Sequence, residues 1–118
     1  MDRPAVLVVD DEPSIRLLCR INLELEGYDV FEAGSLAEAR AAVEAHDLSV
    51  VLLDLRIGNE RGADLVEELH GKEPPVPVVF VTGSADMTPV DHGAADGYLQ
   101  KPFRIEALLR TVGELASR

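Results

Sequence analysis

Along this chain, short apolar runs alternate with segments that have the periodicity of amphipathic helices. Apolar runs of this kind are typical of strands buried on both faces of a parallel sheet, and the helices between them provide the crossovers. The predicted strands span residues 5–9, 28–33, 48–53, 78–81 and 98–100, and the alternation within 28–33 is typical of an edge strand. The pattern therefore predicts an α/β fold, a three-layer sandwich with helices on both faces of a parallel sheet.

Residues with known preferences for helix ends mark the segments between the strands. Pro13 suits the first turn of a helix, and Gly27 closes the same segment. Ser35 followed by Glu38 is a capping-box signal for an Ala-rich helix that ends near His46. Helical periodicity also covers residues 62–69 and 105–115.

Length and charge limit the classes of function. The 118 residues, 47% of them hydrophobic, suffice for one core, so we expect a single domain over residues 1–118. A formal net charge of -11 disfavours direct binding to nucleic acid or to a membrane and favours cations or basic partners. No apolar run approaches the roughly 20 residues of a membrane helix, and neither a leader segment nor paired cysteines suggest secretion. We therefore expect a cytoplasmic protein.

The single cysteine and the three histidines lack the spacing of a metal site. Cys19 lies within the apolar pattern of the first helix, which favours a buried structural thiol over a reactive one. His46, His70 and His92 are interpreted as solvated side chains. The sequence also lacks a glycine-rich loop followed by lysine and serine or threonine, which would cradle a nucleotide phosphate.

Polar residues follow four of the predicted strands at the point where each strand ends. Asp10 and Asp11 follow the first strand, Asp54 the third, Thr82 the fourth and Lys101 the fifth. In an open parallel sheet, ligands bind beyond the carboxyl ends of the strands. The sequence therefore predicts that these side chains converge at one edge of the sheet.

Three carboxylates brought together repel one another, and either a raised pKa on one of them or a bound hard cation relieves this. We favour Mg²⁺, which prefers oxygen ligands. A carboxylate is also a competent nucleophile for phosphoryl groups, and the charge of an aspartyl phosphate needs a metal and a fixed cation. Lys101 would supply that cation and Thr82 a hydroxyl hydrogen bond. Taken singly, each signal also fits a solvated loop, a helix cap, a turn or a solvated lysine; their common position favours a site.

These motifs together resemble the receiver domain of two-component response regulators, a CheY-like superfamily, from about residue 5 to residue 116. The matching stretches are residues 8–12, residues 52–55 with Gly62 downstream, residues 81–83 and residues 97–103. The resemblance implies a flavodoxin-like (βα)5 fold with strand order 2-1-3-4-5. It also implies phosphorelay signal transduction by a phospho-accepting domain that catalyses its own phosphorylation and dephosphorylation and is not a conventional enzyme.

The resemblance assigns a role to each residue at the sheet edge. Asp54 would accept the phosphoryl group in a reaction that depends on Mg²⁺ and tolerates Mn²⁺. Asp11 and the backbone carbonyl of Arg56 would bind the metal directly together with Asp54, and Asp10 would assist, partly through water. Thr82 and Lys101 would hold the phosphoryl oxygens.

The resemblance also implies a switch and a set of partners. In the family, an aromatic residue at the position of Tyr98 turns inward on phosphorylation and remodels the face formed by the fourth helix, the fifth strand and the fifth helix. The expected phosphodonor is a histidine kinase or a histidine phosphotransfer protein. The expected target is a downstream effector protein or domain.

The chain departs from the family pattern at several positions. Gly58 replaces a proline that many members carry, which predicts a looser loop over residues 56–61. Arg56 and Ser84 occupy two variable positions that tune access of water and phosphodonor. The Arg56 side chain would reach the phosphate, pair with a site carboxylate or extend into solvent. Residues 84–96 contain a proline and little apolar periodicity, so we expect a short or irregular helix there.

Two other functions compete with phosphorelay. A pseudo-receiver would bind partners without being phosphorylated, although the retained acids, hydroxyl and lysine disfavour a lost site. A dehalogenase-like phosphatase also uses an aspartate nucleophile and Mg²⁺, but it usually carries a second aspartate two residues later, where this chain has Arg56.

Overall fold

A computed structural model of the chain describes residues 3–83 and 95–117, to which all structural statements refer. Its strands and helices are β1 (Ala5–Val9), α1 (Pro13–Leu25), β2 (Asp29–Ala33), α2 (Leu36–Ala45), β3 (Val50–Leu53), β4 (Arg56–Ile57), β5 (Glu60–Arg61), the 3₁₀ helix η1 (Gly62–Leu65), α3 (Val66–His70), β6 (Val78–Thr82), β7 (Gly97–Gln100) and α5 (Ile105–Ala116). Most of the irregular helix expected over 84–96 lies outside the described residues. Among the described helices, none is both long and apolar enough to cross a membrane.

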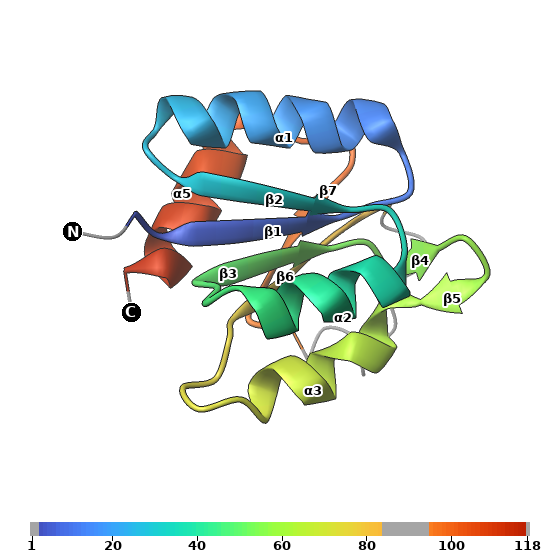
Figure 1. The fold of residues 1–118 in the computed structure, drawn as a ribbon. Coiled ribbons are helices and arrows are strands. Elements are labelled where there is room, and N and C mark those ends of the chain that lie inside the picture. Colours follow the sequence, from blue (N-terminus) through green and yellow to red (C-terminus); the bar gives the residue numbers. More distant parts are fainter. Residues whose placement is uncertain (1–2, 84–94, 118) are drawn as a thin grey trace.

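The main sheet has five parallel strands in the order β2-β1-β3-β6-β7 (Figure 1). This arrangement confirms the predicted order 2-1-3-4-5, with β2 at one edge. β1 pairs with both β2 and β3, so that Val9 is in register with Ala33 on one side and with Leu53 on the other. Because these strands end at the same level, the residues that follow them meet at one edge of the sheet.

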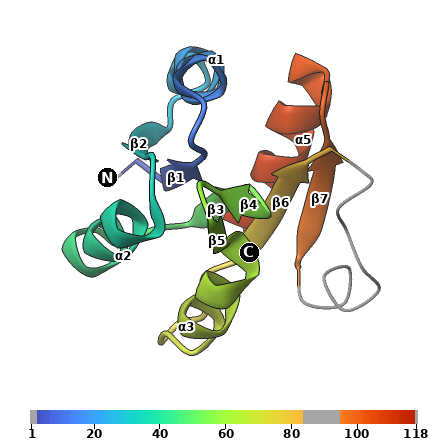
Figure 2. The same cartoon turned by 90° about the vertical axis from the view of Figure 1, so that its right-hand side faces the viewer.

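Helices cover both faces of this sheet, which gives the predicted three layers. Figures 1 and 2 show α1 and α5 on one face and α2 and α3 on the other. Alternate residues of β1 point to opposite faces: Val6 and Val8 pack in the core beneath α1 and α5, whereas Leu7 and Val9 pack in the core beneath α2 and α3. Both faces of the central strands are therefore buried, which explains their continuous apolar runs.

The capping signal before α2 is confirmed, with one difference. Ser35 Oγ accepts a hydrogen bond of 3.1 Å from Glu38 N, as a helix N-cap should. The Glu38 carboxylate accepts from Gly34 N at 2.7 Å, one residue before the position that a standard capping box uses. The Glu38 side chain therefore fixes the turn that leads from β2 into α2.

The prediction of a looser loop over residues 56–61 is wrong, because this segment forms an antiparallel hairpin of β4 and β5. Gly58 adopts a φ of +61°, which glycine tolerates without strain, and Gly58-Asn59 is the two-residue turn. Ile57 is buried against the core beneath α2 and α3 and anchors the hairpin. Gly58 is therefore the turn residue of an ordered segment.

The cysteine and two histidines have defined surroundings. Cys19 is buried as predicted, and burial, with a smaller contribution from Asp10, raises the pKa of its thiol to about 12. His46 is exposed as predicted, and its ring stacks on Phe31 with centroids 3.7 Å apart. The His70 side chain is 37% exposed and thus partly solvated, and its Nε2 also lies 2.8 Å from Asp96 Oδ2. His92 lies outside the described residues.

Candidate functional site

The carboxyl ends of the parallel strands point toward the β4–β5 hairpin, at the right of Figure 1. Asp10 directly follows β1, Asp54 follows β3, Thr82 ends β6 and Lys101 follows β7. All four side chains are largely buried, although an ammonium and two carboxylates are among them. Buried charges need partners, so the pairs that these side chains form determine which ligands this edge of the sheet can bind.

Lys101 is the cation around which the site is built. Its Nζ lies 2.8 Å from Asp10 Oδ2, 3.0 Å from Asp54 Oδ2 and 3.7 Å from Glu12 Oε1. Lys101 N also donates to the Thr82 carbonyl at 2.8 Å, which fixes the lysine main chain at the end of β6. The structure therefore brings together a lysine and two carboxylates that are far apart in the sequence, as predicted.

Asp10 is held through both oxygens of its side chain. Oδ1 accepts a 2.9 Å hydrogen bond from Glu12 N, and Oδ2 accepts from Lys101. The residue is only 2% exposed. A buried carboxylate held through both oxygens has a fixed orientation.

Asp54 has a similar but less saturated environment. Oδ1 accepts a long hydrogen bond of 3.3 Å from Arg56 N, and Oδ2 accepts from Lys101. Burial is the largest effect on Asp54 and raises the pKa of its carboxyl above the ordinary value, although the Lys101 hydrogen bond opposes the shift. The donors around Asp54 therefore do not fully offset the cost of burying its ionised carboxylate, which favours binding of a further cation or a reaction at a carboxylate oxygen.

The electrostatics of Lys101 are consistent with this pairing. Burial alone would lower the pKa of its ammonium, but hydrogen bonds to Asp10 and Asp54 outweigh burial and raise the pKa above its usual range. One permanent ammonium therefore faces the carboxylates of Asp10, Asp54 and Glu12. The local excess of negative charge suits a divalent cation.

Asp10 and Asp11, the acidic doublet, provide oxygen ligands for a hard cation at this edge of the sheet. Carboxylate oxygens of Asp10, Asp11 and Glu12 lie within 4.8 Å of one another. Asp11 is exposed, and its Oδ2 accepts from Gly58 N at 3.0 Å, which ties the doublet to the hairpin. This donor set fits Mg²⁺, which binds carboxylates and retains several waters. The sequence analysis did not predict Glu12 as a site residue, although its position directly after Asp10 and Asp11 indicated it.

Gly62 explains why a glycine belongs to the motif around Asp54. A Cβ atom on Gly62 would overlap the main-chain carbonyl oxygen of Asp54. Gly62 N also donates to the Leu55 carbonyl at 2.8 Å, so the two segments pack backbone against backbone. Any side chain at this position would displace Asp54.

The other predicted site residues are less closely tied to the carboxylates. Thr82 is buried at the end of β6, and its hydroxyl makes a long 3.4 Å contact with the Gly83 carbonyl. Tyr98 on β7 is 56% exposed. Arg56 is exposed and forms no ion pair with a described residue, in agreement with the solvent-directed alternative. Ser84 lies outside the described residues.

Comparisons with known proteins identify the family. A family model described as the response regulator receiver domain matches residues 6–113. The chain is 38% identical over 106 residues to the transcriptional regulatory protein KdpE of Mycobacterium tuberculosis, covering 88% of this chain and 47% of KdpE. It is 33% identical over 121 residues to the aerobic respiration control protein ArcA of Escherichia coli, covering 100% of this chain and 50% of ArcA. The chain thus spans about half the length of these curated relatives.

Solved structures agree with this assignment. A CheY-like receiver domain protein from Methanospirillum hungatei superposes with a TM-score of 0.88 at 27% identity, covering 98% of this chain and 95% of that one. The response regulator TrrA of Thermotoga maritima, solved in complex with Mg²⁺ and beryllofluoride, superposes with a TM-score of 0.85 at 30% identity, covering 95% of this chain and 98% of that one. The chain therefore belongs to the response regulator receiver domain family of two-component signalling.

Proposed function

We propose that this domain accepts a phosphoryl group on Asp54 in a Mg²⁺-dependent reaction and thereby switches the surface around β7. The observation that carries the proposal is the position of Lys101 Nζ, 3.0 Å from Asp54 Oδ2 and 2.8 Å from Asp10 Oδ2. An ammonium held at this point can neutralise a phosphoryl group on Asp54 without moving far. No other described lysine or arginine pairs with both of these carboxylates.

The reaction follows from the chemistry of the carboxylate. A carboxylate oxygen of Asp54 attacks the phosphorus of the donor; the new O–P bond forms as the bond from phosphorus to the donor atom breaks, and the donor leaves with that electron pair. If the donor is a phosphohistidine, the leaving atom is an imidazole nitrogen. Lys101 and the Thr82 hydroxyl stabilise charge on the transferred oxygens, and the Thr82 hydroxyl can turn because its present hydrogen bond to Gly83 is long.

Receiver domains bind Mg²⁺ through acidic residues, and this chain carries the acidic cluster that such binding needs. We assign the cation to Asp11, Asp54 and the Arg56 carbonyl, with Asp10 assisting. Glu12 lies close to Asp10 and Asp11. When bound, Mg²⁺ neutralises phosphoryl oxygens during transfer. The residues of the chain would orient those oxygens so that both the metal and Lys101 can interact with them.

The proposed partners follow from the surface and from the relatives. A histidine kinase or a histidine phosphotransfer protein in the cytoplasm would supply the phosphoryl group. KdpE and ArcA are named as regulatory or control proteins and are about twice as long as this chain, so a downstream effector protein or domain is the proposed target. Tyr98 is exposed and lies on β7, three residues before Lys101. Movement of Lys101 toward a phosphoryl group would therefore alter the surroundings of Tyr98.

Intact-mass spectrometry after incubation with acetyl phosphate tests the proposal. We expect one phosphoryl adduct on the wild type with Mg²⁺, none without Mg²⁺ and none on Asp54→Asn. Asp47→Asn, which changes an exposed acid near the opposite ends of the strands, should be modified like the wild type. An unmodified wild type that also fails to bind beryllofluoride would support a pseudo-receiver. Steady turnover of phosphomonoesters would support a phosphatase.

A further inference from the structure

The main-chain carbonyl of Asp10 has a side chain as its hydrogen-bond donor. β1 ends at Val9, so this carbonyl lies beyond the last paired residue of the strand, and Asp10 is almost fully buried. Arg16 Nη1, from the first half of α1, donates to it at 2.6 Å. A buried carbonyl needs a donor, and a guanidinium provides a charge-assisted one.

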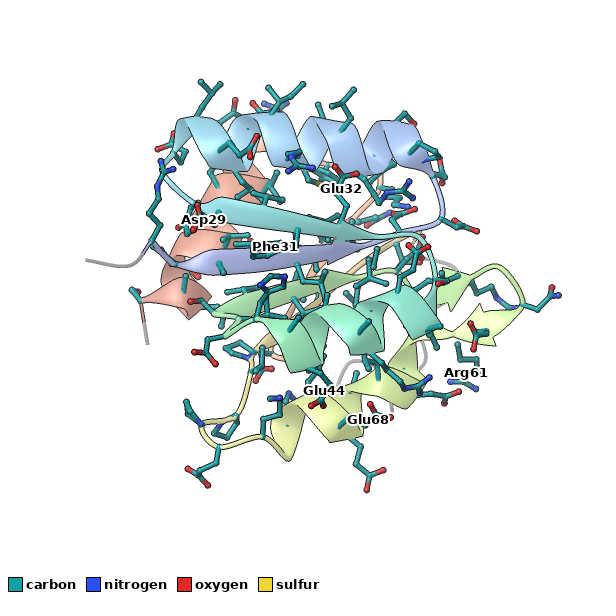
Figure 3. The ribbon with its side chains drawn as sticks, in the orientation of Figure 1. Asp29, Phe31, Glu32, Glu44, Arg61 and Glu68 are labelled. Carbon is teal, nitrogen blue, oxygen red and sulfur yellow. The ribbon has the colours of Figure 1, made fainter. Side chains whose placement is uncertain are left out.

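The guanidinium of Arg16 is itself fixed in place. Its Nε donates to Glu32 Oε1 at 3.1 Å, and Glu32 points from β2 toward α1 (Figure 3). The other oxygen of Glu32 accepts from Arg20 Nη1 at 2.7 Å, one helical turn further along α1. Arg16 thus joins a carboxylate to a carbonyl with two different nitrogens, which the single ammonium of a lysine cannot reproduce.

Gly34 leaves the space that this arrangement requires. A Cβ atom on Gly34 would lie 3.1 Å from Arg16 Nη1, closer than such contacts usually are. The nitrogen that donates to the Asp10 carbonyl is therefore the one that a side chain at residue 34 would displace. Because Gly34 does not have a positive φ, an alanine there would crowd the guanidinium without straining the backbone.

We propose that Arg16 is a positioning residue for the cation site. The carbonyl that it binds belongs to the peptide unit that joins Asp10 to Asp11, so its direction sets where both carboxylates stand. One of them accepts from Lys101 and the other from Gly58 N. Arg16 therefore acts on the site through the main chain, as outer-shell residues do at metal sites. This inference rests on the proposed Mg²⁺ site.

Positioning and simple electrostatics predict opposite effects when Arg16 is removed. A positive charge near a cation site repels the cation, so its loss alone would strengthen Mg²⁺ binding. Loss of positioning would weaken Mg²⁺ binding, because the carboxylates would no longer be held together. The sign of the change in affinity therefore distinguishes the two effects.

Arg20 supplies a matched control. It pairs with the same Glu32 carboxylate from the same helix and carries the same charge, but its guanidinium has no hydrogen bond to Asp10. The dissociation constant of Mg²⁺ can be measured from the backbone NMR shifts of Glu12 and Gly58, whose amides donate to the two carboxylates. We expect Arg16→Met to weaken Mg²⁺ binding about tenfold and Arg20→Met to change it less than twofold.

Two further results are expected. Arg16→Lys should bind Mg²⁺ nearly as weakly as Arg16→Met, since charge without the planar fork does not suffice. With acetyl phosphate, Arg16→Met should form the adduct slowly at low Mg²⁺ and approach the wild-type rate at saturating Mg²⁺. Circular dichroism without Mg²⁺ must show that the variant is folded, because Mg²⁺ would also rescue a variant that is merely unstable.

Several outcomes would overturn the inference. Wild-type or tighter Mg²⁺ affinity in a cooperatively folded Arg16→Met would do so, as would equal weakening in the Arg16 and Arg20 variants. If Arg16→Met does not fold, Gly34→Ala serves instead: a few-fold weaker affinity supports the inference, and an unchanged affinity overturns it. A wild type that shows no Mg²⁺-dependent shifts would refute the proposed site and this inference together, whereas a binding wild type with an unaffected Arg16 variant refutes the inference alone.

Discussion

Two aspartates, Asp54 and Asp96, stand at opposite edges of the same sheet and are paired in different ways. Asp54 follows β3 at the carboxyl edge, where it shares one ammonium with Asp10 and Glu12. Asp96 precedes β7 at the amino edge, where Oδ2 accepts from Val78 N at 2.8 Å and lies 2.8 Å from His70 Nε2.

The two aspartates differ in the charges that surround them. At the amino edge, a single carboxylate contacts a backbone N–H and one imidazole, which ties the end of α3 to the first residue of β6 and to the residue before β7. At the carboxyl edge, the carboxylates of Asp10, Glu12 and Asp54 face a single ammonium, so negative charge is in excess. A lone carboxylate held by two groups stabilises the fold, whereas several carboxylates around one ammonium leave capacity for a cation and a phosphoryl group.

The largest expected effect is on the rate of phosphorylation. Lys101→Met should slow formation of the acetyl phosphate adduct by about 100-fold or more, because a fixed charge on the transferred oxygens is lost. The chain has one other lysine, Lys72, whose Nζ makes only a long contact with the Val43 carbonyl. Lys72→Met should react like the wild type. Similar rates for Lys101→Met and Lys72→Met would show that Lys101 takes no part in the reaction.

The second prediction concerns stability at the amino edge. Asp96→Ala should lower the free energy of unfolding by about 2 kcal/mol, because Val78 N loses its charged acceptor and His70 its partner. Urea unfolding at pH 7 measures this change. Asp29→Ala, which removes a 3.7 Å pair with Arg3 in which both side chains are at least half exposed, should cost little. Equal costs for the two variants would contradict the structural role of Asp96.

The third prediction has the opposite sign. Asp54→Asn should raise the free energy of unfolding by about 1 kcal/mol at pH 7, because it replaces a carboxylate whose burial outweighs its hydrogen bonds with a neutral group. The pKa of Asp54 is raised in the folded protein, so the protonated form favours folding and this contribution is lost as pH rises through the folded pKa. The advantage of the variant should therefore shrink as pH falls toward 3.8, the ordinary value for aspartate.

Unfolding curves of both proteins between pH 7 and pH 4 provide the measurement for Asp54→Asn. A variant that is less stable than the wild type at pH 7, or a difference that grows on acidification, would show that Lys101 fully compensates the carboxylate.

The smallest expected effect is stabilisation by Mg²⁺. A ligand that binds only the folded state, present at about three times its dissociation constant, adds about 0.8 kcal/mol to the free energy of unfolding. Asp96→Ala should retain this increment, because the substitution lies at the other edge of the sheet. Asp11→Asn should lose most of it. Thermal unfolding followed by far-UV circular dichroism with and without Mg²⁺ measures both. An increment that survives in Asp11→Asn would place the cation elsewhere.

Much of the fold could be predicted because each layer has a local signal. Continuous apolar runs such as residues 50–53 report burial on both faces of the sheet, and Ser35 reports the start of a helix. The convergence of Asp10, Asp54 and Lys101 then follows from parallel topology, since the residues after parallel strands meet at one edge.

The remaining features depend on contacts that leave no local pattern. The β4–β5 hairpin is held by burial of Ile57 and by the bond from Gly58 N to Asp11, 47 residues away. The pairing of His70 with Asp96 likewise joins residues 26 positions apart. Exposed histidines and glycines have several common roles, and only the tertiary structure selects among them.

A crystal structure with Mg²⁺ and beryllofluoride would show whether Asp54 accepts the phosphoryl group beside Lys101. We expect the metal between Asp11, Asp54 and the Arg56 carbonyl, the beryllofluoride on the Asp54 carboxylate, and the Lys101 ammonium in contact with a fluoride. A beryllofluoride bound elsewhere, or a Lys101 ammonium directed away from a modified Asp54, would contradict the account.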